Sequence, residues 1–325
     1  MTGDATFRSV LNMKILVTGS TGLVGRALVA ALAKQGHSVC RLVRPETNAN
    51  DDAGGFNVAW NPATGELGGA AVGPDAVVNL AGASIGDGRW TPKRKEELRA
   101  SRVNTTRALI EAIGRMNVKP SVFISASAIG YYGNRGDEVL TEESAAGDDF
   151  LAGITKEWEG EALKAEAWKT RVVLARFGVI LAIEGGALAK MLAPFRLGLG
   201  GRLGSGKQWM SWIALEDVVG ILKMCLEHTP IRGTVEFAPI SGPLNVVAPD
   251  PVTNEEFTNA LAAALRRPAI FPAPAFALRA ALGREMADAL LLANQRVVPS
   301  KVVAAKYEFQ SPTLDKALRR ILSRS

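Results

Sequence analysis

The chain has 325 residues, of which 47% are hydrophobic and 22% are charged, a composition typical of a soluble globular protein with one large or two smaller domains. Its net charge of +6 is modest, and basic residues are not interleaved with aromatic ones, so we expect no nucleic-acid partner. No apolar run approaches the roughly 18 residues that a membrane-spanning helix needs, so we also expect no membrane partner.

The cysteines and histidines are few and dispersed. Cys40 and Cys225 lie in apolar surroundings far apart in the chain, which predicts buried thiols in a reducing compartment. His37 and His228 are the only histidines and no Cys-x-x-Cys pair exists, so we expect no metal site. Residues 1–12 lack the apolar segment of a secretory signal. These features predict a cytoplasmic protein.

Strands and helices alternate from Lys14 onward. Short apolar runs predict strands over residues 14–19, 38–44, 75–82, 121–127 and 171–181. Helical spacing of apolar residues predicts helices over residues 23–36 and 94–116. Strands separated by helices of this length indicate βαβ units, so we expect an α/β fold with a parallel sheet covered on both faces.

The pattern changes after residue 182 to glycine-rich loops followed by helices. Thr253 and Glu256 have capping-box spacing and predict a helix start. Ser311 as N-cap and Pro312 as the first helical residue predict another. We therefore expect a smaller, mostly helical lobe, with some of its segments returning to the sheet. The predicted division is an N-terminal extension (1–12), a nucleotide-binding domain (13–181) and the lobe (182–325).

The stretch "TGSTGLVG", residues 18–25, follows the first predicted strand and opens the first predicted helix. Gly19, Gly22 and Gly25 form a G-x-x-G-x-x-G pattern. The first glycine permits a tight turn, the second lets backbone N–H groups approach a pyrophosphate, and the third lets helix and strand pack closely. The setting favours dinucleotide binding over a merely tight turn.

The end of the second strand indicates which dinucleotide. Proteins that bind NAD place Asp or Glu there to accept a hydrogen bond from the ribose 2′-hydroxyl. This strand ends "RLVRP", with Arg44 and no carboxylate before Glu46. A guanidinium suits a 2′-phosphate, so we expect NADP(H) rather than NAD(H). The alternative is that Arg44 is an ordinary solvated loop residue.

A second glycine string, "GGRLGSGKQ", covers residues 200–208 and contains Gly201, Gly206 and Lys207. Its spacing imitates a phosphate-binding P-loop. Gln208 replaces the Ser or Thr that the motif requires, and no apolar strand precedes it. The sequence therefore argues against an ATPase.

Several motifs together resemble an extended short-chain dehydrogenase/reductase. They are the glycine loop, "NLAGAS" (79–84), "RVNTTRALIEA" (102–112) and "SASAIGYYG" (125–133). Later segments such as "SWIALEDVVG" and "NVVAPDPVTNEEF" resemble its atypical sugar-nucleotide-epimerase-like group, which has a C-terminal domain of unknown function. The resemblance implies a Rossmann-type doubly wound sheet with NADP(H) along the strand ends. It implies cofactor contacts at Gly19, Ser20, Thr21, Gly22, Leu23, Val24, Arg44, Leu80, Ala81, Gly82, Ala83, Ser125, Lys156, Arg176, Phe177 and Gly178.

The resemblance also implies a catalytic unit, and the chain departs from it. Extended members use a Ser or Thr after the fifth strand and a Tyr-x-x-x-Lys pair on the next helix. Ser127 and Lys156 match, but Ala152 occupies the tyrosine position. Proton transfer would then fall to Tyr131, Tyr132 or a bound water. Packing is the alternative for either ring, a loop hydroxyl for Ser127, and a solvated side chain for Lys156; Ser125 could be the relevant hydroxyl instead.

The loop "GSGKQWMSWIALEDVVG", residues 204–220, is a candidate substrate lining. Its glycines would let the loop close, and its side chains offer stacking and hydrogen-bonding groups. The tentative substrate contacts are Gln208, Trp209, Ser211 and Trp212, with packing as the alternative for the tryptophans. Asp217 is interpreted as a helix cap.

Taken together, these features favour an NADP(H)-dependent oxidoreductase or epimerase-like enzyme. Its partner would be a small polar carbonyl or hydroxyl substrate, a nucleotide-linked one being an option. The rival interpretation, supported by Ala152, is a non-catalytic NADP(H)-binding sensor or scaffold. The sequence leaves open whether the protein is a monomer or a homodimer.

Overall fold

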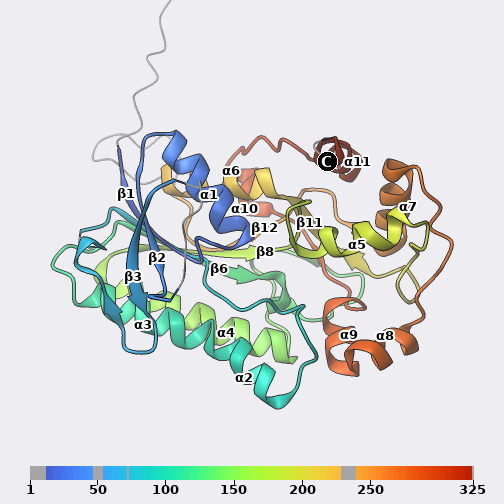
Figure 1. Cartoon of the computed structure of the whole chain (residues 1–325), viewed down its shortest axis with the longest axis horizontal. Helices are drawn as coiled ribbons and strands as arrows, with labels where there is room; N and C mark the ends of the chain where they lie inside the picture. The colour runs from blue at the N-terminus through green and yellow to red at the C-terminus, as the bar shows by residue number, and fades with distance from the viewer. Residues whose placement is uncertain (1–11, 47–53, 72, 228–238, 324–325) are drawn as a thin grey trace, which may run out of the picture.

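The computed structural model describes residues 12–46, 54–71, 73–227 and 239–323 (Figure 1). Most of the expected N-terminal extension and His228 lie outside these ranges. At the centre is an eight-stranded sheet with the order β12-β8-β6-β5-β1-β2-β3-β4. All its neighbouring strands are parallel except β3 and β4. The strands are β1 (Lys14–Thr18), β2 (Ser38–Val43), β3 (Phe56–Asn61), β4 (Glu66–Leu67), β5 (Ala76–Asn79), β6 (Val122–Ala128), β8 (Arg171–Phe177) and β12 (Gly242–Val246).

The sheet confirms the expected Rossmann-type arrangement. β1 pairs with β2 on one side and with β5 on the other, so the strand order reverses at β1. In open parallel sheets, ligands bind at the carboxyl ends of the strands at such a reversal. The glycine loop, which follows β1, therefore lies at the expected ligand crevice.

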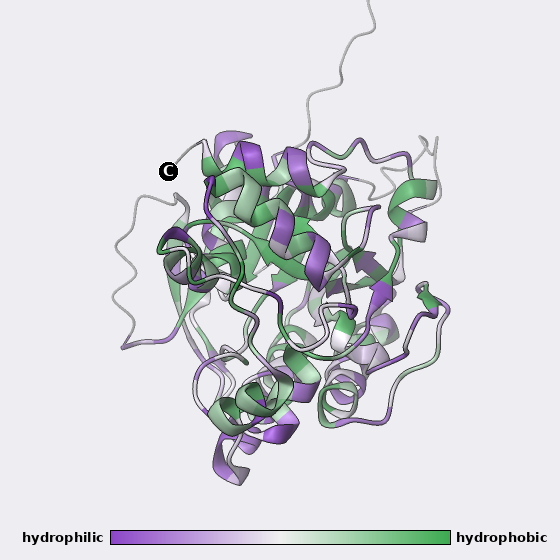
Figure 2. Ribbon diagram, turned by 90° about the vertical axis from the view of Figure 1, so that its right-hand side faces the viewer, coloured by the Kyte–Doolittle hydropathy of each residue, from purple (hydrophilic) through white to green (hydrophobic). Residues whose placement is uncertain are grey.

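Helices cover both faces of the sheet (Figure 1). α1 (Leu23–Lys34) and α6 (Leu215–Glu227) cover one face, while α3 (Val103–Gly114) and α4 (Phe150–Leu163) cover the other. Successive residues of β1 alternate between the two resulting cores, because side chains of a strand point to opposite faces. Both faces are buried, which explains why the strands are apolar almost throughout, as Figure 2 shows.

The predicted helix over residues 94–116 is wrong as a single element. It is two helices, α2 (Pro92–Ala100) and α3, with a break at Ser101 and Arg102. The Arg102 guanidinium donates to the carbonyls of Leu98, at 3.1 Å, and Ala83, at 2.9 Å. These bonds draw the arginine inward and fix the bend.

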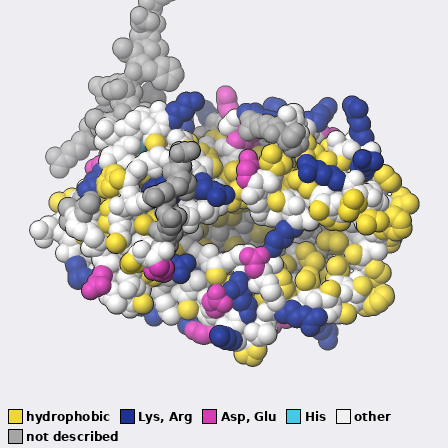
Figure 3. All heavy atoms as spheres, viewed as in Figure 1, with side chains coloured by type: hydrophobic (Ala, Val, Ile, Leu, Met, Phe, Trp, Pro, Cys, Tyr) yellow, Lys and Arg dark blue, Asp and Glu magenta, His cyan; other side chains and the backbone are white. Residues whose placement is uncertain are grey.

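The C-terminal lobe has a core of its own, containing Leu188, Phe257 and Leu318. Its helices are α5 (Gly186–Arg196), α7 (Asn254–Leu265), α8 (Ala275–Leu282), α9 (Arg284–Leu290) and α11 (Leu314–Leu322). Its small sheets pair β9 (Val179–Leu181) with β11 (Trp212–Ala214) and β10 (Trp209–Met210) with β13 (Val252–Thr253). Figure 3 shows hydrophobic side chains gathered over this lobe, at the right of the view.

Some segments after residue 181 return to the nucleotide-binding half. β12 extends the main sheet beside β8, and α6 packs against α1. α10 (Ser300–Ala304) packs on β12. β14 (Arg296–Val297) pairs with β7 (Val139–Leu140). Both halves are therefore built from interleaved stretches of the chain.

Local predictions in this region had mixed outcomes. The predicted strand 171–181 divides at Gly178, where an added Cβ would lie 2.6 Å from the Ser211 carbonyl oxygen. The Thr253–Glu256 capping box of α7 is confirmed. α11 begins later than predicted, with Thr313 as its N-cap. No helix in the described ranges is long and apolar enough to cross a membrane.

The predictions that Ser311 caps α11 and that Asp217 caps a helix are both wrong. The side chain of Asp217 instead binds the backbone of the segment that contains Ser311. The Asp217 carboxylate lies inside α6 and accepts hydrogen bonds from the backbone N–H groups of Gln310, at 2.7 Å, and Ser311, at 3.0 Å. The Tyr307 hydroxyl donates to the same carboxylate at 3.1 Å. Burial raises the pKa of Asp217 above its ordinary value, against these hydrogen bonds. Asp217 therefore anchors the segment that leads to α11.

Candidate functional site

Gly19 and Gly25 in the loop after β1 pack so closely on neighbouring backbone that a side chain would not fit, whereas the N-terminus of α1 has no side-chain cap. Gly19 has a φ of +64°, and an added Cβ would lie 2.4 Å from the Leu80 carbonyl oxygen. At Gly25 an added Cβ would lie 2.1 Å from the Gly19 carbonyl oxygen. Gly22 is the N-cap of α1 and supplies no side-chain cap. The first N–H groups of α1 are therefore left for a ligand.

Ser20, within the loop, has a buried hydroxyl without a partner. Its side chain is only 1% exposed, and its Oγ makes no hydrogen bond to any residue in the described ranges. A buried hydroxyl normally finds a partner, because leaving it unpaired costs free energy. An open helix terminus beside an unpaired hydroxyl fits a pyrophosphate group, so the residues present suit a dinucleotide.

Arg44 is the first residue after β2, at the same edge of the sheet. Its side chain is 69% exposed, and its guanidinium lies 3.9 Å from the Glu46 carboxylate. Within the described residues this loose contact is its one ion pair, so the exposed guanidinium can also bind a phosphate group. The predicted position of Arg44 beside the ribose end of the crevice is compatible with this placement.

A chain of buried hydrogen bonds fixes the segment Leu80–Ala83 that follows β5. Thr18 donates to Asn79 at 2.7 Å, Asn79 donates to Thr106 at 2.8 Å, and the Trp158 indole donates to Thr106 at 3.0 Å. The backbone N–H of Leu80 donates to the Thr18 hydroxyl at 3.1 Å. β1, β5, α3 and α4 are thereby locked together below the crevice.

Arg102 supports the same segment from the α3 side. Besides its bond to Ala83, the guanidinium lies 5.5 Å from the centre of the Trp158 ring. Burial lowers its pKa to about 10. An added Cβ at Gly82 would contact this guanidinium at 3.3 Å, so Gly82 is held close to it.

A buried ion pair lies beneath the predicted catalytic residues, and sequence reasoning missed it. The Arg176 guanidinium on β8 binds both carboxylate oxygens of Glu159 on α4, each at 2.8 Å. The Ser127 hydroxyl on β6 donates to the same carboxylate at 2.5 Å. Burial opposes the charge of Arg176, but Glu159 outweighs it and raises the pKa of the guanidinium. The only signal in the sequence was the placement of Glu159 one turn after Lys156.

The two tyrosines after Ser127 have different environments. Tyr132 is fully buried, and its hydroxyl donates to Asn245 at 2.7 Å and accepts from Arg176 at 3.0 Å. Burial raises its pKa. Tyr131 is half-buried, and the Arg176 guanidinium lies 3.5 Å from the centre of its ring. Tyr131 is therefore the more accessible of the two tyrosines.

Lys156 is exposed on α4 and lies near Tyr131. Its Nζ donates to the Gly147 carbonyl at 3.4 Å, and the Gly147 N–H donates to the Tyr131 carbonyl at 2.9 Å. Ala152, one turn earlier, is 0% exposed. The position of the usual catalytic tyrosine is therefore occupied by a buried methyl group that cannot transfer a proton. The structure instead brings Lys156 beside the Tyr131 loop.

The other predicted cofactor contacts are placed as follows. Ser125 is fully buried, and its hydroxyl donates to the Ala126 carbonyl at 3.1 Å. The Arg176 side chain is buried in the ion pair with Glu159, so Arg176 would contact a cofactor through its backbone. Gly178 is closely packed, as described above, while Phe177 is half-buried at the end of β8.

The predicted substrate loop is mostly interior, which corrects two of its four residues. Trp212 is 0% exposed in the lobe core, and its indole donates to the Asp250 carbonyl. Ser211 is 1% exposed and donates to the carbonyls of Gln295 and Val297. Both side chains therefore support the lobe: Trp212 is the first residue of β11, and Ser211 lies between β10 and β11.

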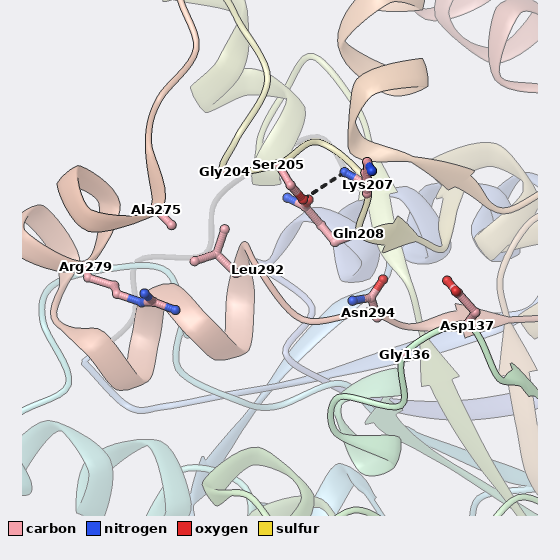
Figure 4. Close-up of a pocket in the computed structure, with 10 residues that line it drawn as sticks. All are labelled: Gly136, Asp137, Gly204, Ser205, Lys207, Gln208, Ala275, Arg279, Leu292 and Asn294. Carbon is pink, nitrogen blue, oxygen red and sulfur yellow. Dashed lines mark hydrogen bonds between the residues drawn. The ribbon is translucent and has the colours of Figure 1, made fainter.

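Gln208 and Trp209 border a cavity of about 450 Å³ (Figure 4). Gln208 lines it directly, and the Trp209 indole donates to the lining residue Asp137 at 3.0 Å. The other lining residues include Lys207, Arg279, Leu292 and Asn294. Gly136 and Asp137 follow β6, whereas the other walls come from the lobe. The cavity therefore lies between the two halves of the molecule.

Comparison with known proteins gives matches along almost the entire chain. Residues 15–235 match the NAD dependent epimerase/dehydratase family, and residues 273–321 match a domain of unknown function, DUF1731. Epimerase family protein ML0860 of Mycobacterium leprae is 44% identical over 305 residues, which are 94% of this chain and 94% of that protein.

Two solved structures are similar in both sequence and fold. The crystal structure of human epimerase family protein SDR39U1 (isoform 2) with NADPH has a TM-score of 0.83 and 35% identity, covering 96% of this chain and 100% of the human chain. A nucleoside-diphosphate sugar epimerase from Corynebacterium glutamicum has a TM-score of 0.73 and 34% identity, covering 96% of this chain and 58% of that chain. Both likenesses include the lobe as well as the sheet.

Proposed function

Because the chain belongs to the NAD dependent epimerase/dehydratase family, we propose that it is an NADP(H)-dependent oxidoreductase or epimerase-like enzyme for a small polar carbonyl or hydroxyl substrate. The observation that carries the proposal is the glycine loop, with an open α1 terminus and an unpaired buried Ser20 hydroxyl. The NADPH in the human SDR39U1 crystal structure supports the choice of cofactor.

The glycine loop would hold the cofactor pyrophosphate, and Arg44 the 2′-phosphate. Leu80–Ala83 would line the adenosine side, and Lys156 would bind the second ribose. When bound, the cofactor supplies or accepts a hydride. The protein's own task is to bind and orient the substrate, exclude water and move one proton.

We propose that the Tyr131 hydroxyl transfers the proton that accompanies hydride transfer. The Tyr132 hydroxyl already donates to Asn245, and the Ser127 hydroxyl already donates to Glu159. Both are therefore positioning residues: they hold the loop leaving β6 against α4 and β12. Tyr131 is the half-buried phenol of the pair, and Lys156 reaches its loop through Gly147. The catalytic pair is thus rebuilt from the loop and the helix rather than from the helix alone.

The first experiment measures cofactor binding by calorimetry. We expect NADPH to bind more tightly than NADH, and Arg44→Ala to weaken NADPH by about tenfold or more while leaving NADH unchanged. Gly25→Val should abolish binding of both, because its side chain would meet the Gly19 carbonyl. Arg115→Ala, far from the glycine loop in sequence, is a matched arginine control. Binding of neither cofactor by the wild type refutes the proposal.

The second experiment tests turnover with NADPH or NADP⁺ and a panel of carbonyl and hydroxyl metabolites, sugar nucleotides included. Tyr131→Phe should abolish the chemical step and leave NADPH affinity unchanged. Cofactor binding without turnover of any compound would favour the rival function, an NADP(H)-dependent sensor or scaffold. The buried Ala152 supports that rival, because the usual tyrosine is absent.

A further inference from the structure

Residues 294–301, which lie within the stretch that matches the domain of unknown function, run beside the part of the chain between β6 and α4. β14 pairs in parallel with β7 there, and the Val298 N–H donates to the Leu140 carbonyl at 2.9 Å. The Lys301 N–H donates to the buried Glu142 carboxylate at 3.2 Å. This C-terminal segment is therefore hydrogen-bonded to the nucleotide-binding half along its length.

The Gln295 side chain in this segment bridges the turn that carries Tyr131. That turn is a short 3₁₀ helix, Ile129–Tyr132, directly after β6. The Gln295 amide donates to the carbonyls of Ile129, at 3.3 Å, and Gly133, at 3.2 Å. These two carbonyls lie on either side of Tyr131 in the chain, so one side chain joins the start of the turn to its end.

Gln295 is itself held in place through its backbone. Its N–H donates to the Trp209 carbonyl at 3.3 Å, and its carbonyl accepts from the Ser211 hydroxyl at 2.8 Å. The N–H of the preceding residue, Asn294, donates to the Asn134 side chain at 3.0 Å. Because the backbone is fixed on both sides, the Gln295 amide has little freedom to leave the turn.

The other contacts of Tyr131 do not brace the turn as a whole. The Arg176 guanidinium lies against the ring, at 3.5 Å from its centre, and the Tyr131 carbonyl accepts from the Gly147 N–H at 2.9 Å. Within the turn, the Gly133 N–H donates to the Gly130 carbonyl at 3.2 Å. Short 3₁₀ turns have poor hydrogen-bond geometry, so a brace from outside the turn matters for its shape.

We propose that Gln295 is a positioning residue for the Tyr131 hydroxyl, and that the domain of unknown function completes the catalytic half in this way. The assignment rests on the proposed function, in which Tyr131 transfers the proton. A neutral amide suits the task, because it offers two N–H donors to two carbonyls and adds no charge beside Arg176. Misplacing a catalytic group by about 1 Å can slow the chemical step by about a hundredfold.

Fluorine NMR of the full chain labelled with fluorotyrosine tests the brace. The chain has three tyrosines, so it gives three resonances, which Tyr131→Phe and Tyr307→Phe assign. Gln295→Met keeps the side-chain length and removes both donors. We expect the Tyr131 resonance to shift or broaden and the Tyr307 resonance to stay, because the Tyr307 hydroxyl is bound to Asp217. Gln35→Met, at an exposed glutamine after α1, is the matched control and should move no resonance.

A second variant and a kinetic measurement make the test independent of one substitution. Asn134→Ala, at an exposed residue, removes the acceptor of the Asn294 N–H and should move the Tyr131 resonance in the same direction by less. With any compound that the wild type turns over, Gln295→Met should lower kcat by about tenfold to a hundredfold and leave NADPH affinity unchanged.

Two outcomes overturn the assignment. The first is an unmoved Tyr131 resonance in Gln295→Met or Asn134→Ala protein whose Tyr307 resonance is that of the wild type. The second is equal movement of the Tyr131 and Tyr307 resonances in both variants, which would show a general structural role. A displaced Tyr131 resonance combined with normal turnover by Tyr131→Phe would support the brace and refute the proposed proton transfer instead.

Discussion

Glu159 and Arg176 form an ion pair whose side chains are 7% and 2% exposed, with Ser127 and Tyr132 as additional partners. Removing one member of a buried pair leaves a charge without compensation, which costs about 3–5 kcal/mol. We expect Arg176→Met to lower the free energy of unfolding by that amount. The double variant with Glu159→Leu should lose much less than the sum of the single changes. Urea denaturation measures all three.

The control for the Glu159 and Arg176 variants is an exposed ion pair between two residues that are three positions apart in the chain. Glu138 binds Arg135, and its side chain is 47% exposed. Glu138→Gln should therefore cost less than about 1 kcal/mol. Additive losses for Glu159 and Arg176 would contradict the idea that the two charges depend on each other.

The two buried thiols make the free energy of unfolding depend on pH. Burial raises the pKa of Cys40 to about 11 and that of Cys225 to about 12. Unfolded thiols ionise near pH 8.5, so below this pH both states hold the protons and the stability is fully present. As pH rises towards 11, the unfolded state loses its protons first, and the free energy of unfolding falls. Each thiol contributes up to about 1.4 kcal/mol per pH unit in this window.

The comparison is with the Cys40→Ala/Cys225→Ala variant between pH 8 and 11. Its stability should be lower at pH 8 because two cavities are created, but it should fall less steeply with pH. Identical slopes would show that the native thiols titrate normally. In the folded wild type, neither thiol should react with a thiol reagent at pH 8.

Residue-level predictions from sequence succeeded where backbone requirements determine residue type. The glycines after β1 were identified because only glycine tolerates the close approaches to Leu80 and Gly19. The orientations of Arg176, Ser211 and Trp212 were not predictable, because they depend on which strands become neighbours. Glu159 was missed for the same reason, since its partner lies on β8, in another part of the chain.

At the scale of the element, two helical glycines should respond oppositely to alanine. Gly220 on α6 has no room, because an added Cβ would lie 2.1 Å from the Tyr307 hydroxyl. A Cβ added at Gly160 on α4 would have no neighbouring atom within 4 Å. Gly160→Ala should stabilise the protein by about 0.5–1 kcal/mol through helix propensity, whereas Gly220→Ala should destabilise it. Thermal denaturation of both variants checks the sign, and a stabilised Gly220→Ala would contradict the packing described.

The elements themselves were predicted best where both sequence period and end signals agree. β1, β2 and the α7 capping box are examples. α2 and α3 were merged because the break is caused by a long-range contact of Arg102 with Ala83, which leaves no local signal. α8 and α9 were not predicted, and α8 has no fully buried residue, so its apolar period is weak.

At the scale of the whole molecule, Asp217 joins the sheet-bearing half to the C-terminal segment. Asp217→Asn keeps the size but replaces one of the two acceptor oxygens by an NH2 group, so at least one of the three converging donors faces another donor instead of an acceptor. We expect a loss of about 2–4 kcal/mol and easier proteolysis between residues 305 and 323. Asp315→Asn, an exposed aspartate on α11, is the control. Equal proteolysis of both variants would count against the anchor.

The lobe core joins residues that are distant in the chain, and this has a consequence for biosynthesis. Leu188 and Leu192 of α5 pack in the same cluster as Leu314 and Leu318 of α11. During translation, α5 can pack on β9 and later on α7, but the lobe core is completed only when α11, which packs on α7, has left the ribosome. The nascent lobe is exposed to chaperones and to premature association for most of its synthesis, whereas the β1–β8 part of the sheet can assemble while the ribosome is still working.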